Sequence, residues 1–150
     1  MRNWAMMIGS MAMSGLVLAG CGGGDAAPAS SAGAPAAAGG ATTVTATMKD
    51  LTLAVDKNSG KAGEFTFKAD NKGALAHELA VLKTDVAADK IPQKDAKADE
   101  STGKLIGRTA EIAAGKAESK TVKLEAGKYV LLCNVPAHYA AGMAVAFTVQ

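Results

Sequence analysis

The residues with the most distinctive chemistry in this 150-residue chain are a cysteine, a histidine and a methionine at equal spacing. Cys133, His138 and Met143 follow one another at intervals of five residues in the segment CNVPAHYAAGM. The chain has 2 histidines, 2 cysteines and 7 methionines, and five of the methionines lie within the first 13 residues. His77 is the other histidine, so these four side chains are the candidates for a shared site.

This set of donor atoms favours a particular metal. Thiolate and thioether are soft ligands that favour copper, and imidazole binds copper in both of its oxidation states. Two histidines and a cysteine in a trigonal plane, with a distant axial methionine, make a type 1 or blue copper site. Zinc is the alternative, but it prefers tetrahedral sets of Cys, His and carboxylate. We therefore expect one copper ion, cycling between Cu(I) and Cu(II), at His77, Cys133, His138 and Met143.

Short β-strands must carry these ligands. Apolar and polar residues alternate in segments at 42–48, 51–55, 63–71, 75–82, 105–112, 119–124, 129–133 and 144–149. Such alternation is typical of half-buried strands, and Asn-Ser-Gly at 58–60 and Asn-Lys-Gly at 71–73 indicate turns. Seven to eight short strands without a clear helix predict an all-β fold, a Greek-key β-sandwich.

The alternation also predicts where the ligands lie. His77 has the parity of Leu75, Leu79 and Val81, an apolar row that we expect to face the core. The loop over residues 133–143 joins two neighbouring strands, so its ends and its middle can converge on one point. Residues 83–104 are charged and contain few apolar side chains, which predicts a solvated loop with one helical turn.

The beginning of the chain has the layout of an export signal. Arg2 precedes an apolar stretch at residues 4–18, which is short for a membrane span. The tetrad Leu18-Ala19-Gly20-Cys21 resembles the lipobox of bacterial lipoproteins, which implies cleavage before Cys21 and lipidation of its sulfur. An uncleaved signal anchor is the alternative. Gly at position 22 resembles the pattern of outer-membrane lipoproteins, but the sequence leaves the choice of membrane open.

A tether follows the predicted lipidation site. Residues 22–41 are all Gly, Ala, Pro or Ser except Asp25, so we expect a flexible segment that forms no packed face. The predicted organisation is a signal peptide at 1–20, a lipidated cysteine and tether at 21–41, and a folded domain at 42–150. The domain is expected to be exported and lipid-anchored to a bacterial membrane, in the periplasm or on the cell surface.

Residues 42–150 resemble a cupredoxin. The spacing C-x4-H-x4-M is similar to that of auracyanins and rusticyanins, and His77 and the segment YVLLC at 129–133 also match the family pattern. The resemblance implies copper held by the four candidate ligands and a role as a one-electron carrier. Several cupredoxins have Asn after the first histidine, whereas here Glu78 follows His77 and Asn134 follows Cys133. We therefore hypothesise that Glu78 and Asn134, or the backbone near them, join the two ligand segments.

Composition narrows the choice of function. With 16 basic and 14 acidic residues the net charge is +2, too balanced for a nucleic-acid-binding protein. Copper enzymes with further imidazole-rich centres would need histidines that the chain lacks, so we predict that it is not an enzyme. A thiol peroxidase would lack a resolving cysteine if Cys21 is lipidated. Copper delivery without electron transfer and a metal-free structural lipoprotein remain as alternatives.

The expected partners follow from the position of His138. The residues around it form a small apolar collar, which we expect a redox protein to contact briefly. We expect the domain to act as a monomer. This collar consists of Val135, Pro136, Ala137, Tyr139, Ala140, Ala141 and Gly142.

Overall fold

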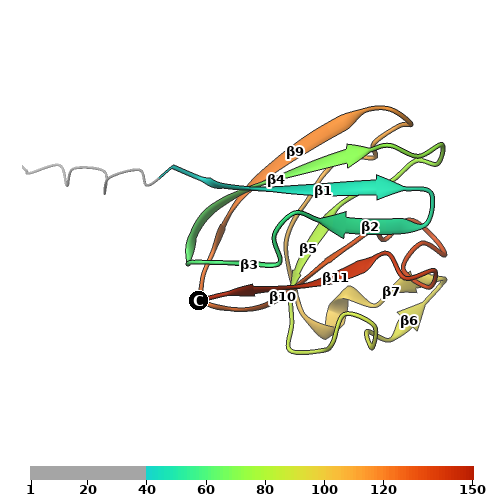
Figure 1. The fold of residues 1–150 in the computed structure, drawn as a ribbon. Helices are drawn as coiled ribbons and strands as arrows, with labels where there is room; N and C mark the ends of the chain where they lie inside the picture. Colours follow the sequence, from blue (N-terminus) through green and yellow to red (C-terminus); the bar gives the residue numbers. More distant parts are fainter. Residues whose placement is uncertain (1–39) are drawn as a thin grey trace, which may run out of the picture. The chain divides into compact units, whose positions relative to one another are not determined.

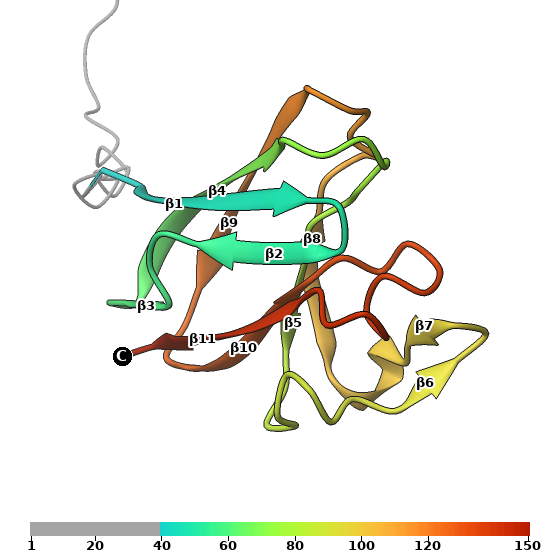
Figure 2. The same ribbon diagram turned by 45° about the vertical axis from the view of Figure 1, so that its right-hand side comes forward.

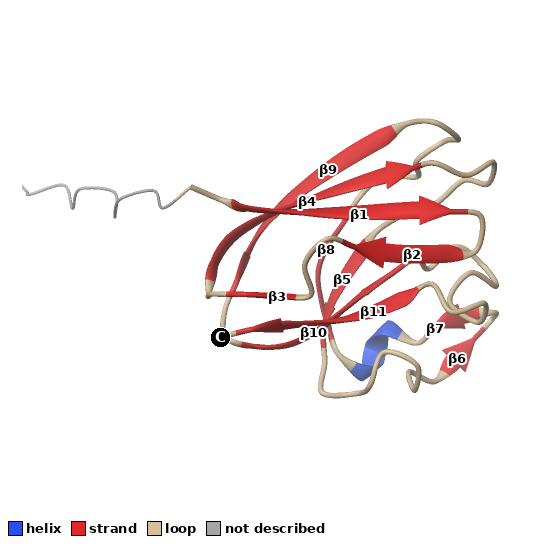
Figure 3. Cartoon of the chain, viewed as in Figure 1, coloured by secondary structure: helices blue, strands red, loops and turns tan. Residues whose placement is uncertain are grey.

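The computed structural model describes residues 40–150, which form a sandwich of two β-sheets (Figure 1). The predicted signal peptide, Cys21 and most of the predicted tether lie outside the described residues. Strands make up nearly all of the regular structure, as Figure 3 shows. The prediction of an all-β sandwich is confirmed. Within residues 40–150 no helix is long and apolar enough to cross a membrane.

The first sheet has the strand order β2-β1-β4-β9. β1 pairs parallel with β4, while β2 and β9 are antiparallel to their neighbours. The strands are β1 (Thr42–Lys49), β2 (Thr52–Val55), β4 (Gly63–Asn71) and β9 (Ala117–Leu124).

The second sheet has the order β3-β11-β10-β5-β8. It contains the two strands that flank the candidate ligand loop, β10 and β11, which pair antiparallel from Gly127–Val149 to Leu132–Ala144. Eight strands of the sandwich correspond to the eight predicted segments, and the two-residue β3 adds one more. The strands are β3 (Ser59–Gly60), β5 (Ala80–Lys83), β8 (Lys104–Arg108), β10 (Gly127–Leu132) and β11 (Ala144–Val149).

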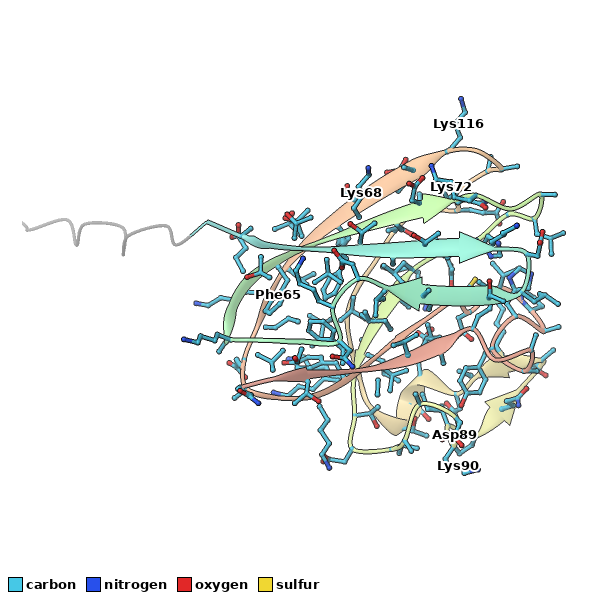
Figure 4. The ribbon with its side chains drawn as sticks, viewed as in Figure 1. Phe65, Lys68, Lys72, Asp89, Lys90 and Lys116 are labelled. Atoms are coloured by element: carbon cyan, nitrogen blue, oxygen red, sulfur yellow. The ribbon has the colours of Figure 1, made fainter. Side chains whose placement is uncertain are left out.

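The core between the sheets contains all three phenylalanines. Phe147 meets Phe65 and Phe67 edge to face, with ring centroids 5.5 Å apart in each pair. Each of the three side chains is buried, as alternation along β4 and β11 predicts. Figure 4 shows Phe65 between the two sheets. This packing fixes the position of one sheet relative to the other and so positions the strand ends that bear the site.

The segment between β5 and β8 contains the predicted helical turn, but it is more ordered than the predicted solvated loop. It forms a small hairpin of β6 (Gln93–Lys94) and β7 (Lys97–Ala98), followed by the 3₁₀ turn η1 (Glu100–Thr102). Ile91 and Ala98 are buried against the outer face of the second sheet, where they pack with Leu82, Leu132 and Tyr139. β5 and β10 are therefore buried on both faces, which explains their continuous apolar runs.

The turned view in Figure 2 shows where the ligand segments gather. The loop between β10 and β11 lies beside the β6–β7 hairpin, at the end of the sandwich where β1 and β4 also end. The first residues of β1 lie at the opposite end of the sandwich (Figure 1). The candidate site and the start of the folded domain are thus at opposite ends.

Candidate metal centre

Three of the four predicted ligands meet in a tight triangle. Nδ1 of His77 lies 3.2 Å from Nδ1 of His138 and 3.7 Å from Sγ of Cys133, and His138 Nδ1 lies 3.4 Å from the same sulfur. The point in the plane of the three atoms that is equidistant from them lies about 2.0 Å from each, which is close to metal bond lengths to imidazole and thiolate. The three atoms are therefore placed to share one metal ion.

Met143 closes the loop that carries two of these residues. The Cys133 amide donates to the Met143 carbonyl at 3.0 Å, and the Met143 amide donates to the His138 carbonyl at 3.2 Å. Met143 is fully buried and belongs to the same apolar cluster as Cys133. All four predicted residues lie close together, and their sulfur and imidazole donors fit copper better than zinc.

His77 reaches the site from an irregular segment rather than from a strand. The predicted strand at 75–82 is regular only from Ala80 onward, and His77 forms an isolated bridge in which it and Ile112 exchange two backbone hydrogen bonds. Leu79 and Val81 face the core as predicted, but Leu75 is 45% exposed, so its expected place in the apolar row was wrong. The bridge to Ile112 replaces a strand in orienting the histidine.

Asn71 is a structural residue of this site whose role was not predicted from the sequence. Its buried side-chain amide donates to the carbonyls of Leu75 (2.7 Å) and Ile112 (2.9 Å) and accepts from the Gly73 amide (3.0 Å). These three bonds fix the loop that leads into His77 and the Ile112 backbone that bridges to it. A single buried Asn at a strand end has no distinctive spacing, so only the structure identifies it.

The site is buried with one edge near the surface. His77, Cys133 and Met143 have no exposed surface, whereas His138 is 8% exposed. Most of the collar is exposed or half-buried, as expected, but Tyr139 is 5% exposed and points away from that surface. Its hydroxyl accepts from the Ile91 amide and donates to the Ala88 carbonyl, so it anchors the segment that covers the second sheet.

Burial also sets the protonation of the ligands when no metal is bound. Desolvation, with a smaller effect from the nearby His138, lowers the pKa of His77 below its ordinary value. Desolvation raises the pKa of the Cys133 thiol, against hydrogen bonds from the backbone of Glu78 and Val135. At neutral pH the metal-free site therefore holds a neutral His77 and a protonated Cys133, and binding a metal must displace the thiol proton.

The hypothesised link between the two ligand segments is present through the backbone of Glu78, whereas the side chains of Glu78 and Asn134 form no hydrogen bond with each other. The Glu78 amide donates to Cys133 Sγ at 3.5 Å, and its carboxylate faces Arg108, with Nη1 3.3 Å from Oε1. The Asn134 side chain exchanges two hydrogen bonds with Ala98 and donates to Glu100. The side chains of Glu78 and Asn134 are instead joined through Arg108 and Glu100, which sequence spacing could not reveal.

Comparisons with known proteins agree with this geometry. The model of the family described as copper binding proteins, plastocyanin/azurin family, matches residues 41–150. Dithionite-reduced auracyanin from the photosynthetic bacterium Roseiflexus castenholzii is 28% identical, with a TM-score of 0.54 over 74% of this chain and 99% of that chain. A comparison with curated protein sequences finds no match.

Two further solved structures share the fold at lower identity. Auracyanin A, a "blue" copper protein from Chloroflexus aurantiacus, is 19% identical, with a TM-score of 0.54 over 74% of this chain and 100% of that chain. Rusticyanin from Thiobacillus ferrooxidans is 22% identical, with a TM-score of 0.50 over 72% of this chain and 76% of that chain. Because the family match spans the whole domain from residue 41 onward, the chain belongs to the plastocyanin/azurin family of copper-binding proteins, and its cofactor is a type 1 copper ion.

Proposed function

We propose that this domain is a one-electron carrier in which His77, Cys133, His138 and Met143 bind the copper. The triangle of two Nδ1 atoms and one Sγ atom, with edges of 3.2 to 3.7 Å, is the observation that carries the proposal. When bound, copper supplies reversible one-electron chemistry. The protein's contribution is to hold the donors in one arrangement, so that little has to move when the charge changes.

The ligands are held by backbone structure on both sides. Cys133 directly follows β10, Met143 directly precedes β11, and the hydrogen bond between them continues the pairing of these strands. His77 is fixed by its bridge to Ile112. Ligands supported in this way resist the change in geometry that Cu(I) and Cu(II) would otherwise each favour.

His138 is the proposed entry point for the electron. It is the ligand with exposed surface, and Pro136, Ala137, Ala140, Ala141 and Gly142 around it are exposed and uncharged. A small apolar face of this kind suits a brief encounter with a redox protein, because transient interfaces are small and dissociate quickly. The partners proposed are a protein electron donor and a protein acceptor that dock on this face of the monomer.

We further propose that the domain is exported and anchored by lipid on Cys21. The support is the lipobox-like tetrad at 18–21 and the composition of the segment after it. Since β1 starts at the end of the sandwich opposite to the site, an anchored domain could present the His138 face away from the membrane. Mass spectrometry tests the anchor: an unmodified Cys21 in the mature protein would contradict it.

Electron transfer and copper delivery make different predictions for the same ligands. The copper-loaded protein should take up and release one electron reversibly in a redox titration, and should lose copper slowly to a chelator. Slow loss is expected because three of the four ligands have no exposed surface. Rapid transfer of copper to an acceptor at neutral pH, or an irreversible titration, would favour delivery and contradict the carrier.

A further inference from the structure

A row of four polar side chains connects the two ligand segments beside the metal centre. Glu78 follows His77 and Asn134 follows Cys133, while Arg108 ends β8 and Glu100 begins η1. Arg108 Nη1 lies 3.3 Å from Glu78 Oε1, and Arg108 Nη2 pairs with Glu100 Oε1. The side-chain amide of Asn134 donates to that same Glu100 oxygen at 2.6 Å. We call Glu78, Arg108, Glu100 and Asn134 the relay.

The relay lies where the pairing of the sheet stops. The ladder between β5 and β10 ends at Ala80 and Leu132, so Glu78 and Asn134 both lie beyond it. Further hydrogen bonds fix both ends of the relay. The Glu78 backbone amide donates to Cys133 Sγ, and the Asn134 side chain accepts from the Ala98 amide and donates to the Ala98 carbonyl. Beyond the end of the β5–β10 ladder, the side chains of the relay therefore help to connect the segment of His77 to the segment of Cys133.

Arginine is required at the centre of this arrangement. The side chains of Glu78, Glu100 and Arg108 are 16%, 24% and 32% exposed, so their charges are partly withdrawn from water. One guanidinium presents two separate nitrogens to two carboxylates, which the single ammonium of a lysine cannot do. Without that bridge, the two carboxylates lose the cation that they share, and the side-chain connection from Glu78 to Asn134 is broken.

We propose that Arg108 and Glu100 are positioning residues of the copper centre. By holding Glu78 they keep its amide directed at the Cys133 sulfur, and by holding Asn134 they fix the start of the ligand loop. Hydrogen bonding around the cysteine sulfur tunes the redox potential of such sites, and groups that orient ligands govern metal retention. The inference rests on the proposed function, because it takes His77 and Cys133 as copper ligands.

The test uses two conservative variants of the full chain and one matched control. R108K keeps the positive charge but replaces the two guanidinium nitrogens by a single ammonium. E100Q keeps the shape of the Glu100 side chain but removes its negative charge. E125Q makes the same change in a carboxylate that pairs with Lys83 at the far end of the sandwich. The copper-loaded proteins are compared by the rate of copper loss to a chelator, by redox potential and by visible spectrum.

R108K and E100Q should each lose copper about tenfold faster than wild type, in line with other residues that orient metal ligands. Each should also shift the potential and the thiolate-to-copper band, while E125Q changes none of these. The double variant should lose copper no faster than R108K alone, because the relay is already broken in the single variant.

The outcomes separate the two proposals. If wild type binds copper with a blue spectrum but R108K and E100Q both behave as E125Q does, the relay has no positioning role. If their copper-loss rates rise but add in the double variant, or spectrum and potential stay unchanged, the residues act independently or through stability only, and the proposal fails. If R108K does not fold, E100Q alone decides. A wild-type protein that forms no blue complex overturns the proposed function instead.

Discussion

Nδ1 of His77 lies 3.2 Å from Nδ1 of His138, although 61 positions separate the two residues in the chain. Two protonated imidazoles would repel each other strongly at this distance in a buried site. Both rings direct the same nitrogen toward the thiol of Cys133, while Nε2 of His77 is buried on the other side without a hydrogen-bond partner in the described chain. The arrangement is that of donors grouped to share one cation.

The buried His77 makes the copper-free protein sensitive to acid. Desolvation lowers the pKa of His77 in the folded state, so below about pH 6.5 the unfolded chain binds a proton that the folded chain does not. The free energy of unfolding should therefore decrease as the pH falls from about 6.5 toward 5, by at most about 1.4 kcal/mol per pH unit from this group. Urea unfolding of the apoprotein at several pH values measures the slope. His77→Gln should flatten it, and an unchanged slope in that variant would contradict the assignment.

Asn71 should contribute to stability through its three buried hydrogen bonds. Asn71→Ala leaves the carbonyls of Leu75 and Ile112 without this donor, which should cost about 1–3 kcal/mol of unfolding free energy. Asn58→Ala is the matched control: Asn58 is exposed, and the change should stay within about 0.5 kcal/mol. Chemical denaturation measures both. Equal effects of the two substitutions would show that Asn71 does not hold the loop before His77.

Met143 should set the redox potential. Its thioether is the expected axial ligand, and axial ligand identity is a principal means of tuning such sites. Met143→Leu removes a donor that stabilises Cu(II) and should raise the potential, whereas Met143→Gln introduces a harder oxygen and should lower it. Each change should reach about 59 mV, a tenfold change in a one-electron equilibrium. If a redox titration places both variants at the wild-type value, Met143 is not a ligand.

The face around His138 should govern electron exchange. Ala141→Glu adds a negative charge to this exposed, uncharged surface and should slow self-exchange between two copies about tenfold at low ionic strength, with recovery in salt. Copper content should not change. Ala54→Glu, at an exposed position on β2, serves as the control. NMR line broadening of mixed oxidised and reduced protein gives the rate, and equal rates in the two variants would place the exchange surface elsewhere.

Alternation and donor chemistry were sufficient to predict the sandwich and the grouping of the ligands. Strands such as β4, with Phe65, Phe67 and Ala69 on one side, are half-buried. Apolar and polar residues therefore alternate along their sequences, and this alternation can be recognised without a structure. The loop spacing from Cys133 to Met143 is local, so convergence of its donors followed from the strands at its two ends.

The remaining features depend on contacts between distant segments. Residues 83–104 contain few apolar side chains, and the burial of Ile91 and Ala98 depends on Tyr139, which lies far along the chain. Leu75 shares the parity of His77 but lies before the regular strand, where parity no longer fixes direction. Arg108 and Glu100 gain their significance from Glu78 and Asn134, which only the fold brings near.

Binding of one copper ion by Cys133, His77, His138 and Met143 can be measured by visible absorption of the protein loaded with one equivalent of Cu(II). We expect an intense thiolate-to-copper band that disappears on reduction and is absent from Cys133→Ser. A colourless oxidised protein, or a band that survives in Cys133→Ser, would contradict it.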